Sequence, residues 1–171
     1  RTISSAASDV YKRQVITNPP YLSIKQALCS SSRNQYEEKF LTASGQYDLY
    51  TLFLEQSFYW LKPGGILCAL LPTPFLVNHH QASIRQHLLK ESQLLEIWDL
   101  GKHVFDHTAA VESTVILVQK HPPSSNNVTT AKKLFPYLTL NTMSSKHLQQ
   151  SAFSHYSETP FNLNLIDECL T

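Results

Sequence analysis

The chain has 171 residues, of which 42% are hydrophobic and 16% charged, and its formal net charge is +1. This composition excludes wholesale disorder, and it excludes nucleic-acid binding by bulk positive charge alone. No apolar run reaches the roughly 18 residues that would span a bilayer, so no membrane partner is expected.

The first fourteen residues match no pattern that leads into a strand. The run SSAASDVYKRQ, from Ser4 to Gln14, resembles a peptide that recurs at the ends of environmental gene fragments, where a sequencing adapter has been translated in frame. We therefore expect residues 1–14 to be a non-native leader and the natural protein to enter at about Val15. A genuine polar helix or loop is the alternative.

The predicted elements begin with a strand. Val15–Thr17 is a short β-branched run, which the rigid turn Asn18-Pro19-Pro20-Tyr21 ends abruptly. Residues 22–46 are polar and indicate a loop with one helical stretch. Asp48 is an expected helix N-cap. Apolar residues then recur near helical spacing at Leu49, Leu52, Phe53, Trp60 and Leu61. The sequence Lys62-Pro63-Gly64-Gly65 is expected to stop this helix.

Strands dominate the middle of the chain. Ile66–Leu71 is a continuous apolar run, typical of a strand covered on both faces, and Pro72-Thr73-Pro74 breaks it. A second helix is expected over residues 80–90, with Ile84, Leu88 and Leu89 facing inward. Leu94–Leu100 and Ser113–Gln119 are further predicted strands. Because no helix-length segment separates them, we expect an antiparallel hairpin.

The order of these elements predicts an α/β fold. In open α/β sheets, ligands bind beyond the carboxyl ends of the strands, where Asn18–Tyr21 and Pro72–Pro74 both lie. From His121 the composition becomes polar. Residues 121–171 are expected to be a linker, around Pro122–Asn127, followed by a tail with isolated apolar anchors.

Asn18-Pro19-Pro20-Tyr21 is the most specific chemical signal. The two prolines fix φ, so the turn cannot relax, and the Asn18 side-chain oxygen and a nearby main-chain carbonyl can converge as two fixed acceptors. Such a pair would hold a planar amino group and raise the electron density on its nitrogen for methyl transfer. Tyr21 offers a flat face for stacking. The alternative is a rigid turn in which Tyr21 only packs.

This tetrapeptide resembles the motif of S-adenosylmethionine-dependent amino methyltransferases, above all the N6-adenine DNA methyltransferases of restriction–modification systems. The resemblance continues in order through five further segments and covers roughly Val15 to Lys120. The segments are Tyr47–Glu55, Leu61–Gly65, Leu71–Leu76, Glu96–Gly101 with Val104-Phe105, and Thr114–Val118. It implies the C-terminal half of a Rossmann-like methyltransferase sheet that ends in an antiparallel hairpin. It also implies a target-recognition region that begins after His121 and is truncated here.

The resemblance implies roles for individual residues. The family swings its target adenine out of double-stranded DNA into a pocket. Asn18 and the Pro19 carbonyl, within the Asn18–Tyr21 motif, would hold the amino group, and Tyr21 would stack on the base. Phe105 would cover the other face of the base. Phe53, with Asn18, would border the cofactor S-adenosylmethionine, although an apolar residue at helical spacing is more often plain core.

The family's glycine-rich cofactor loop and ribose-binding acid precede the Asn-Pro-Pro-Tyr strand, and no Gly-x-Gly lies upstream of Val15. We therefore expect residues 15–120 to be a partial catalytic domain, inactive alone and weak in cofactor binding. A sheet edge would also lack its neighbour.

Other readings stay open. The planar amino group could belong to a protein glutamine or to RNA, although the Glu-Pro pair usual in the glutamine-modifying subgroup is missing. A non-catalytic DNA-binding remnant is a different class of hypothesis. The expected partners are double-stranded DNA and a fused or separate restriction or specificity subunit. The expected compartment is a bacterial or archaeal cytoplasm, because no signal peptide is present.

Metal and disulfide sites are not expected. The three cysteines are scattered, and His103 and His107 lack the acidic partner of a helical zinc motif. The small cluster Lys132-Lys133 is expected to be a solvated face.

Overall fold

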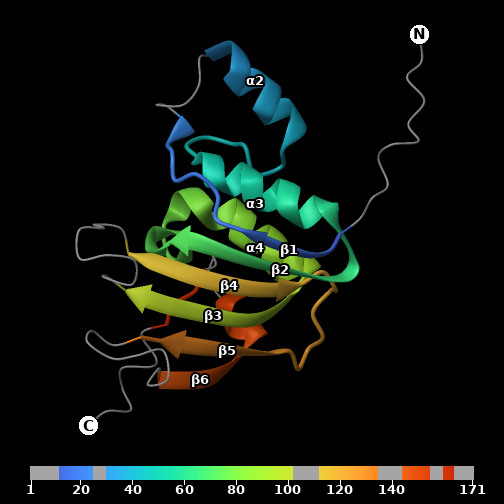
Figure 1. Cartoon of the computed structure of the whole chain (residues 1–171), viewed down its shortest axis with the longest axis vertical. Helices are drawn as coiled ribbons and strands as arrows, with labels where there is room; N and C mark the ends of the chain where they lie inside the picture. Colours follow the sequence, from blue (N-terminus) through green and yellow to red (C-terminus); the bar gives the residue numbers. More distant parts are fainter. Residues whose placement is uncertain (1–11, 25–29, 102–111, 135–143, 155–159, 164–171) are drawn as a thin grey trace.

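The computed structural model describes residues 12–24, 30–101, 112–134, 144–154 and 160–163 (Figure 1). These residues form a mixed sheet with the strand order β1-β2-β4-β3-β5-β6. The strands are β1 (Lys12–Thr17), β2 (Leu61–Pro72), β3 (Gln93–Gly101), β4 (Ser113–Gln119), β5 (Val128–Lys133) and β6 (Ser144–Gln149). The helices are α2 (Ser30–Lys39), α3 (Leu49–Trp60) and α4 (Ala82–Glu91), with short 3-10 helices η1 (Thr73–Leu76), η2 (His79–Gln81) and η4 (Gln150–Ser154).

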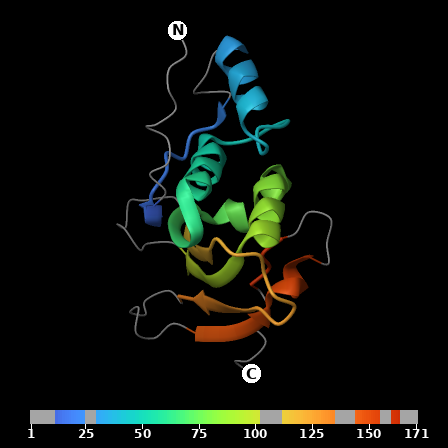
Figure 2. The same cartoon turned by 90° about the vertical axis from the view of Figure 1, so that its right-hand side faces the viewer.

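Helices α3, α4 and η4 cover the same face of the sheet (Figures 1 and 2). Side chains from all three join those of the strands in one core cluster. Helix α2 lies beyond α3, and its neighbourhood forms a second, smaller cluster around Ile24, Ala43, Tyr47 and Leu52.

The first strand begins earlier than predicted. Its bounds are Lys12–Thr17, so three residues of the expected leader lie in β1, and two of them, Lys12 and Gln14, pair with β2 in parallel. The division of the chain at residue 14 itself stays a prediction.

The sequence Lys62-Pro63-Gly64-Gly65 belongs to β2 and not to a separate helix stop. Lys12 pairs with Leu61 and Gln14 with Ile66, so the segment bulges out of the ladder. Gly64 has φ +76°, and a Cβ on Gly65 would lie 2.9 Å from the carbonyl oxygen of Lys62, so this bulge requires glycine.

The C-terminus of α3 is closed by a lysine from the far end of β4. Lys120 Nζ donates to the carbonyl oxygens of Phe58 (3.1 Å), Tyr59 (3.3 Å) and Leu61 (2.7 Å). It also lies 5.2 Å from the centre of the Phe58 ring. Burial lowers the pKa of Lys120. A cation at a helix C-terminus satisfies carbonyls that have no partner within the helix.

The inward face of α3 differs from the predicted one. The residues that meet the sheet are Tyr50, Leu54 and Phe58, whereas Phe53 and Trp60 are 45% and 51% exposed. Apolar residues occur around most of this helix, so spacing alone did not identify the buried stripe. In α4, by contrast, Ile84, Leu88 and Leu89 are buried as predicted.

The prediction that β2 is covered on both faces is wrong within the described residues. Leu67, Ala69 and Leu71 are fully buried, while the alternate residues Ile66, Cys68 and Leu70 are only partly buried. The cause is that the described helices all lie on one face. On the other face, Ile16 of the edge strand β1 is 83% exposed.

The predicted antiparallel hairpin of β3 and β4 is confirmed. β4 also pairs antiparallel with β2, so it inserts between β2 and β3. The chain does not leave the sheet after the hairpin. β5 pairs in parallel with β3, and β6 pairs antiparallel with β5. The expected division at residue 121 therefore does not coincide with a break in the sheet, and the target-recognition role of 121–171 stays a prediction.

Hydrogen bonds from the side chain of Gln150, at the start of η4, connect the segment that contains β5, β6 and η4 to the rest of the fold. This side chain is 3% exposed. Oε1 accepts from the main-chain N–H of Leu94 (2.7 Å) and from Asn127 Nδ2 (2.5 Å). Nε2 donates to the carbonyl oxygens of Leu89 (3.1 Å) and Ser92 (2.9 Å). One buried amide thus satisfies main-chain groups at the corner between α4 and β3.

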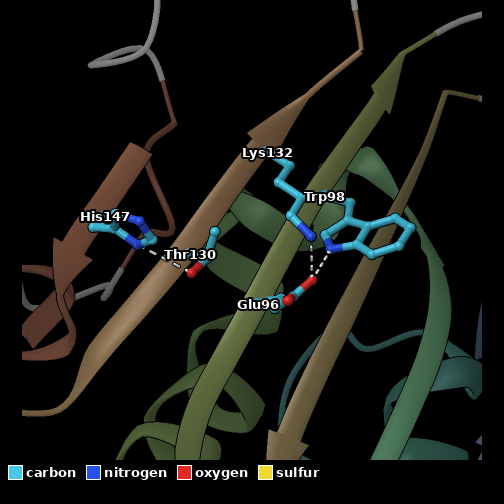
Figure 3. A network of polar contacts seen from close by, with 5 residues as sticks. All are labelled: Glu96, Trp98, Thr130, Lys132 and His147. Carbon is cyan, nitrogen blue, oxygen red and sulfur yellow. Dashed lines mark hydrogen bonds and ion pairs between the residues drawn. The ribbon is translucent and has the colours of Figure 1, made fainter. Parts of the chain in front are cut away.

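The open face of the sheet carries a polar cluster, shown in Figure 3. Lys132 Nζ lies 2.8 Å from Glu96 Oε2 and 4.6 Å from the centre of the Trp98 ring, and Trp98 Nε1 donates to the same carboxylate oxygen. Thr130 and His147 contact each other alongside, at 3.2 Å. The side chain of Lys132 is only 27% exposed, so the expected solvated face is wrong for this lysine. The positive charge of Lys132 is paired with Glu96 on the neighbouring strand.

Candidate active site

The candidate site lies at the carboxyl ends of β1 and β2. These strands are parallel, with Thr17 opposite Ala69, so their carboxyl ends lie at the same edge of the sheet. The segment Asn18–Tyr21 follows β1 there, and η1 follows β2. The two predicted turn segments are therefore neighbours, at the edge where open α/β sheets bind ligands.

Within Asn18–Tyr21 the side chains alternate between solvent and core. Asn18 and Pro20 are exposed, Pro19 is buried, and Tyr21 is partly buried. The Tyr21 ring packs on the main core, and its centre lies 6.2 Å from that of Tyr50 in an edge-on arrangement. Burial raises the pKa of the Tyr21 hydroxyl, which has no hydrogen-bond partner in the part of the chain that the structure describes. The core thus fixes Tyr21 while Asn18 faces outward.

Contacts with α3 hold the chain that follows Tyr21. The N–H of Leu49 donates to the carbonyl oxygen of Leu22 at 2.8 Å, and Ser23 forms an antiparallel bridge with Asp48. Tyr50, the second residue of α3, is 2% exposed and contacts Phe75 of η1 at 6.5 Å between ring centres. Tyr50 therefore links the segment after β1 with the segment after β2.

A buried arginine fixes the segment after β2. Arg85 of α4 is 0% exposed, and its Nη1 donates to the carbonyl oxygens of Phe75 and Asn78, both at 2.8 Å. Gln81 of η2 is 1% exposed, and its Nε2 donates to Asp48 Oδ2 at 2.9 Å. These two side chains join η1 and η2 to α4 and to the start of α3.

Asp48 occupies the predicted N-cap position of α3, but its side chain does not cap the helix. The carboxylate instead accepts from Gln81. Burial raises the pKa of Asp48, and the neighbouring His80 acts in the opposite direction. The predicted N-cap position is therefore confirmed, while the carboxylate makes a tertiary contact in place of a capping hydrogen bond.

The other predicted site residues are placed as follows. Phe53 lies three residues after Tyr50 on α3 and is 45% exposed. This exposure contradicts the plain-core reading and leaves its ring able to stack on a planar group, as the predicted cofactor role requires. Phe105 lies outside the described residues, as do His103 and His107. Among the residues described, no group of three or more His, Cys, Asp or Glu side chains could hold a metal ion.

Sequence reasoning missed three residues that shape this edge: Tyr50, Gln81 and Arg85. Arg85 left a detectable signal, because it shares a helical face with Leu88 and Leu89, and a cation on an apolar stripe needs buried acceptors. Gln81 left no such signal, since its partner Asp48 is 33 residues away in the sequence.

Within the described part of the chain, every helix is too short or too polar to span a membrane.

Comparison with solved structures shows the fold. The type IIG restriction endonuclease BpuSI superposes with a TM-score of 0.66 at 15% identity, covering 90% of this chain and 21% of that one. The class I S-adenosylmethionine-dependent methyltransferase lmo1582 of Listeria monocytogenes gives a TM-score of 0.57 at 20% identity, covering 72% and 37%. The predicted fold, part of a Rossmann-like methyltransferase sheet, is confirmed.

Comparison of sequences agrees. The Type II methyltransferase M.BanIII of Aneurinibacillus aneurinilyticus is 36% identical over 87 residues, which are 51% of this chain and 15% of that protein. The Type II restriction enzyme and methyltransferase RM.Eco57I of Escherichia coli is 30% identical over 91 residues, 52% of this chain and 9% of the relative. The chain thus spans a small part of the relatives it matches. Residues 14–105 match the family model of the Eco57I restriction-modification methylases, and the chain belongs to that family.

Proposed function

We propose that this chain is part of a site-specific DNA methyltransferase that transfers a methyl group from S-adenosylmethionine to the N6 amino group of a flipped adenine. The observation that carries the proposal is the geometry of Asn18–Tyr21. An exposed amide follows β1 at the ligand-binding edge of the sheet, between the end of the strand and a tyrosine anchored in the core.

The residues present suit a planar amino substrate. The Asn18 side-chain oxygen and the Pro19 carbonyl are acceptors on adjacent residues, and proline restricts their relative orientation. Two N–H donors of one amino group can bind both, which orients the nitrogen and raises its electron density. Tyr21 stacks on the base from one side, and Phe105 covers the other.

The residues present also suit part of the cofactor. Phe53 has an exposed ring on α3, which can stack on an adenine, and Asn18 is the second cofactor contact that we propose. Bound S-adenosylmethionine supplies an electrophilic methyl group. Asn18 would contribute by orienting the accepting nitrogen toward that methyl group.

We also propose the compartment, the substrate and the partner subunit of the parent protein. The parent protein would act in a bacterial or archaeal cytoplasm on double-stranded DNA, with a restriction or specificity subunit fused or separate. RM.Eco57I, which combines both activities by name, supports the fused arrangement.

The test is methyl transfer by the full-length parent carrying Asn18→Ala. We expect a loss of at least about 10²-fold in turnover on unmethylated DNA, the magnitude typical of removing one positioned hydrogen-bonding group. Asn34→Ala, at an exposed position of α2, is the matched control and should be silent. Unchanged transfer by Asn18→Ala would refute the role assigned to Asn18, and absence of transfer by the parent itself would support a non-catalytic remnant. Radiolabel on a release factor or RNA, or on cytosine in the DNA digest, would refute the adenine assignment.

A further inference from the structure

A small cavity lies beside the candidate active site. Its volume is about 50 Å³, and it lies between the segment after Tyr21, the start of α3 and η2. The residues that line it are Ser23, Ile24, Arg33, Gly45, Gln46, Tyr47, Asp48, His80 and Gln81. Because one water needs roughly 10–15 Å³ by this measure, the cavity has room for about four non-hydrogen atoms.

Two buried polar atoms of this lining have no hydrogen-bond partner among the described residues. They are Tyr47 Oη and Gln81 Oε1, on side chains that are 2% and 1% exposed. Buried polar atoms without partners are costly, so each indicates a ligand or ordered water. The Gln81 amide cannot simply rotate, because its Nε2 donates to Asp48 Oδ2 and a flip would place oxygen against the carboxylate. Gln81 Oε1 is therefore a fixed acceptor.

The charge of the cavity favours a cation. Asp48 brings a partly buried carboxylate, of which only Oδ2 is hydrogen-bonded within the described part of the chain. Arg33 lines the same cavity, but its Nε is paired with Glu37 at 2.8 Å and its Nη2 donates to the carbonyl oxygen of Gly45 at 2.6 Å. His80 also lines the cavity. The open positions are thus acceptors: one carboxylate oxygen, one amide oxygen and one hydroxyl.

We propose that this cavity binds the guanidinium group of an arginine side chain supplied by a protein partner. A guanidinium has four non-hydrogen atoms and five N–H donors in a fixed plane, which matches the volume and the set of three acceptors. An ammonium ion fills less of the cavity and has no planar fork. Because Ser23 follows Tyr21 by two residues, the bound arginine flanks the candidate active site. The inference does not depend on the proposed methyl transfer.

The experiment is an NMR titration of the 171-residue chain at pH 7.5 with methylguanidinium chloride. We expect saturable shifts of the Gln81 side-chain amide and of the Tyr47 and Asp48 backbone amides, with a dissociation constant on the order of 1–10 mM for so small a ligand. Asp48→Asn should weaken binding at least about tenfold, since it removes the carboxylate charge among the residues that line the cavity. Glu38→Gln, at an exposed position of α2, is the matched control.

Tyr47→Phe removes one hydroxyl with little change of shape and serves if Asp48→Asn does not fold; it should weaken binding severalfold. Methylammonium chloride should bind more weakly than methylguanidinium. A blocked arginine amide and agmatine then separate the sources: tighter binding of the arginine amide supports a protein side chain, and tighter binding of agmatine overturns that part of the proposal. Absence of saturable shifts would mean that the cavity holds water only, and equal binding by Asp48→Asn and the parent chain would mean that the ligand does not use this carboxylate; either result would overturn the proposal.

Discussion

Gln150→Met is the sharpest test of how the fold holds together. The substitution keeps the length of the side chain but removes four hydrogen bonds, three of them to main-chain groups of Leu89, Ser92 and Leu94. At about 1 kcal/mol for each main-chain group that loses its partner, the expected loss of unfolding free energy is about 3 kcal/mol. Such a loss is a large fraction of the roughly 5–15 kcal/mol that stabilises a typical protein.

The assay is urea unfolding followed by circular dichroism, with Gln149→Met as the control because Gln149 is exposed on the neighbouring β6. A slope of about 2 kcal/mol per molar urea converts the expected loss into a midpoint lowered by about 1.5 M. The control should move the midpoint little. A loss below about 1 kcal/mol for Gln150→Met, or one equal to the control's, would refute the reasoning that this amide joins η4 to the corner between α4 and β3.

Three further outcomes are expected. Lys120→Met should lower the unfolding free energy by about 1–2 kcal/mol, because the carbonyls at the end of α3 lose their cation. Lys90→Met is the control and should have little effect, because the Lys90 side chain is 83% exposed. Equal losses for the two variants in urea unfolding would contradict the capping role of Lys120. Burial raises the pKa of Glu96, but hydrogen bonds from Lys132 and Trp98 outweigh burial, so the pKa lies below its ordinary value of 4.5. The stabilisation from this carboxylate is therefore complete above pH 4.5 and is lost as the pH falls through the lowered pKa. The stability difference between the parent chain and Glu96→Gln should shrink in acid for this reason. A stability difference that grows as pH falls would contradict this sign. Finally, calorimetry should detect weak or no S-adenosylmethionine binding by the 171-residue chain, whose sequence holds no Gly-x-Gly loop, and micromolar affinity would contradict the prediction.

Dense, strongly patterned segments could be predicted from the sequence. β4 has the predicted bounds, because Ser113–Gln119 is a β-branched run with polar ends. β5 and β6 were missed, since the strand sequences VTTAKK and SSKHLQ are polar and place only isolated residues, such as Ala131 and Leu148, in the core. Strands at the end of a sheet need few apolar residues, so their pattern is weak.

In the candidate site, too, some residues could be predicted from the sequence and others could not. Asn18–Tyr21 could be found because its chemistry lies in four consecutive residues. The side chains that hold it in place come from α3, η2 and α4, and they meet only through tertiary contacts such as Gln81 with Asp48 and Arg85 with Phe75. Spacing rules describe neighbours along a helix or strand, so they carry no information about such pairs.

The position of β4 constrains the order in which the sheet can form. β2 and β3 are not neighbours, and each reaches the other only through β4, which is made after both. A nascent chain that ends before Ser113 therefore leaves unpaired the edges of β2 and β3 that β4 later joins. Closing the sheet needs a contact between Leu67 and Val118, which are far apart along the chain. We expect this strand pairing, and not the formation of the helices, to limit the folding rate. Long-range strand pairing must first overcome the entropy of closing the intervening loop.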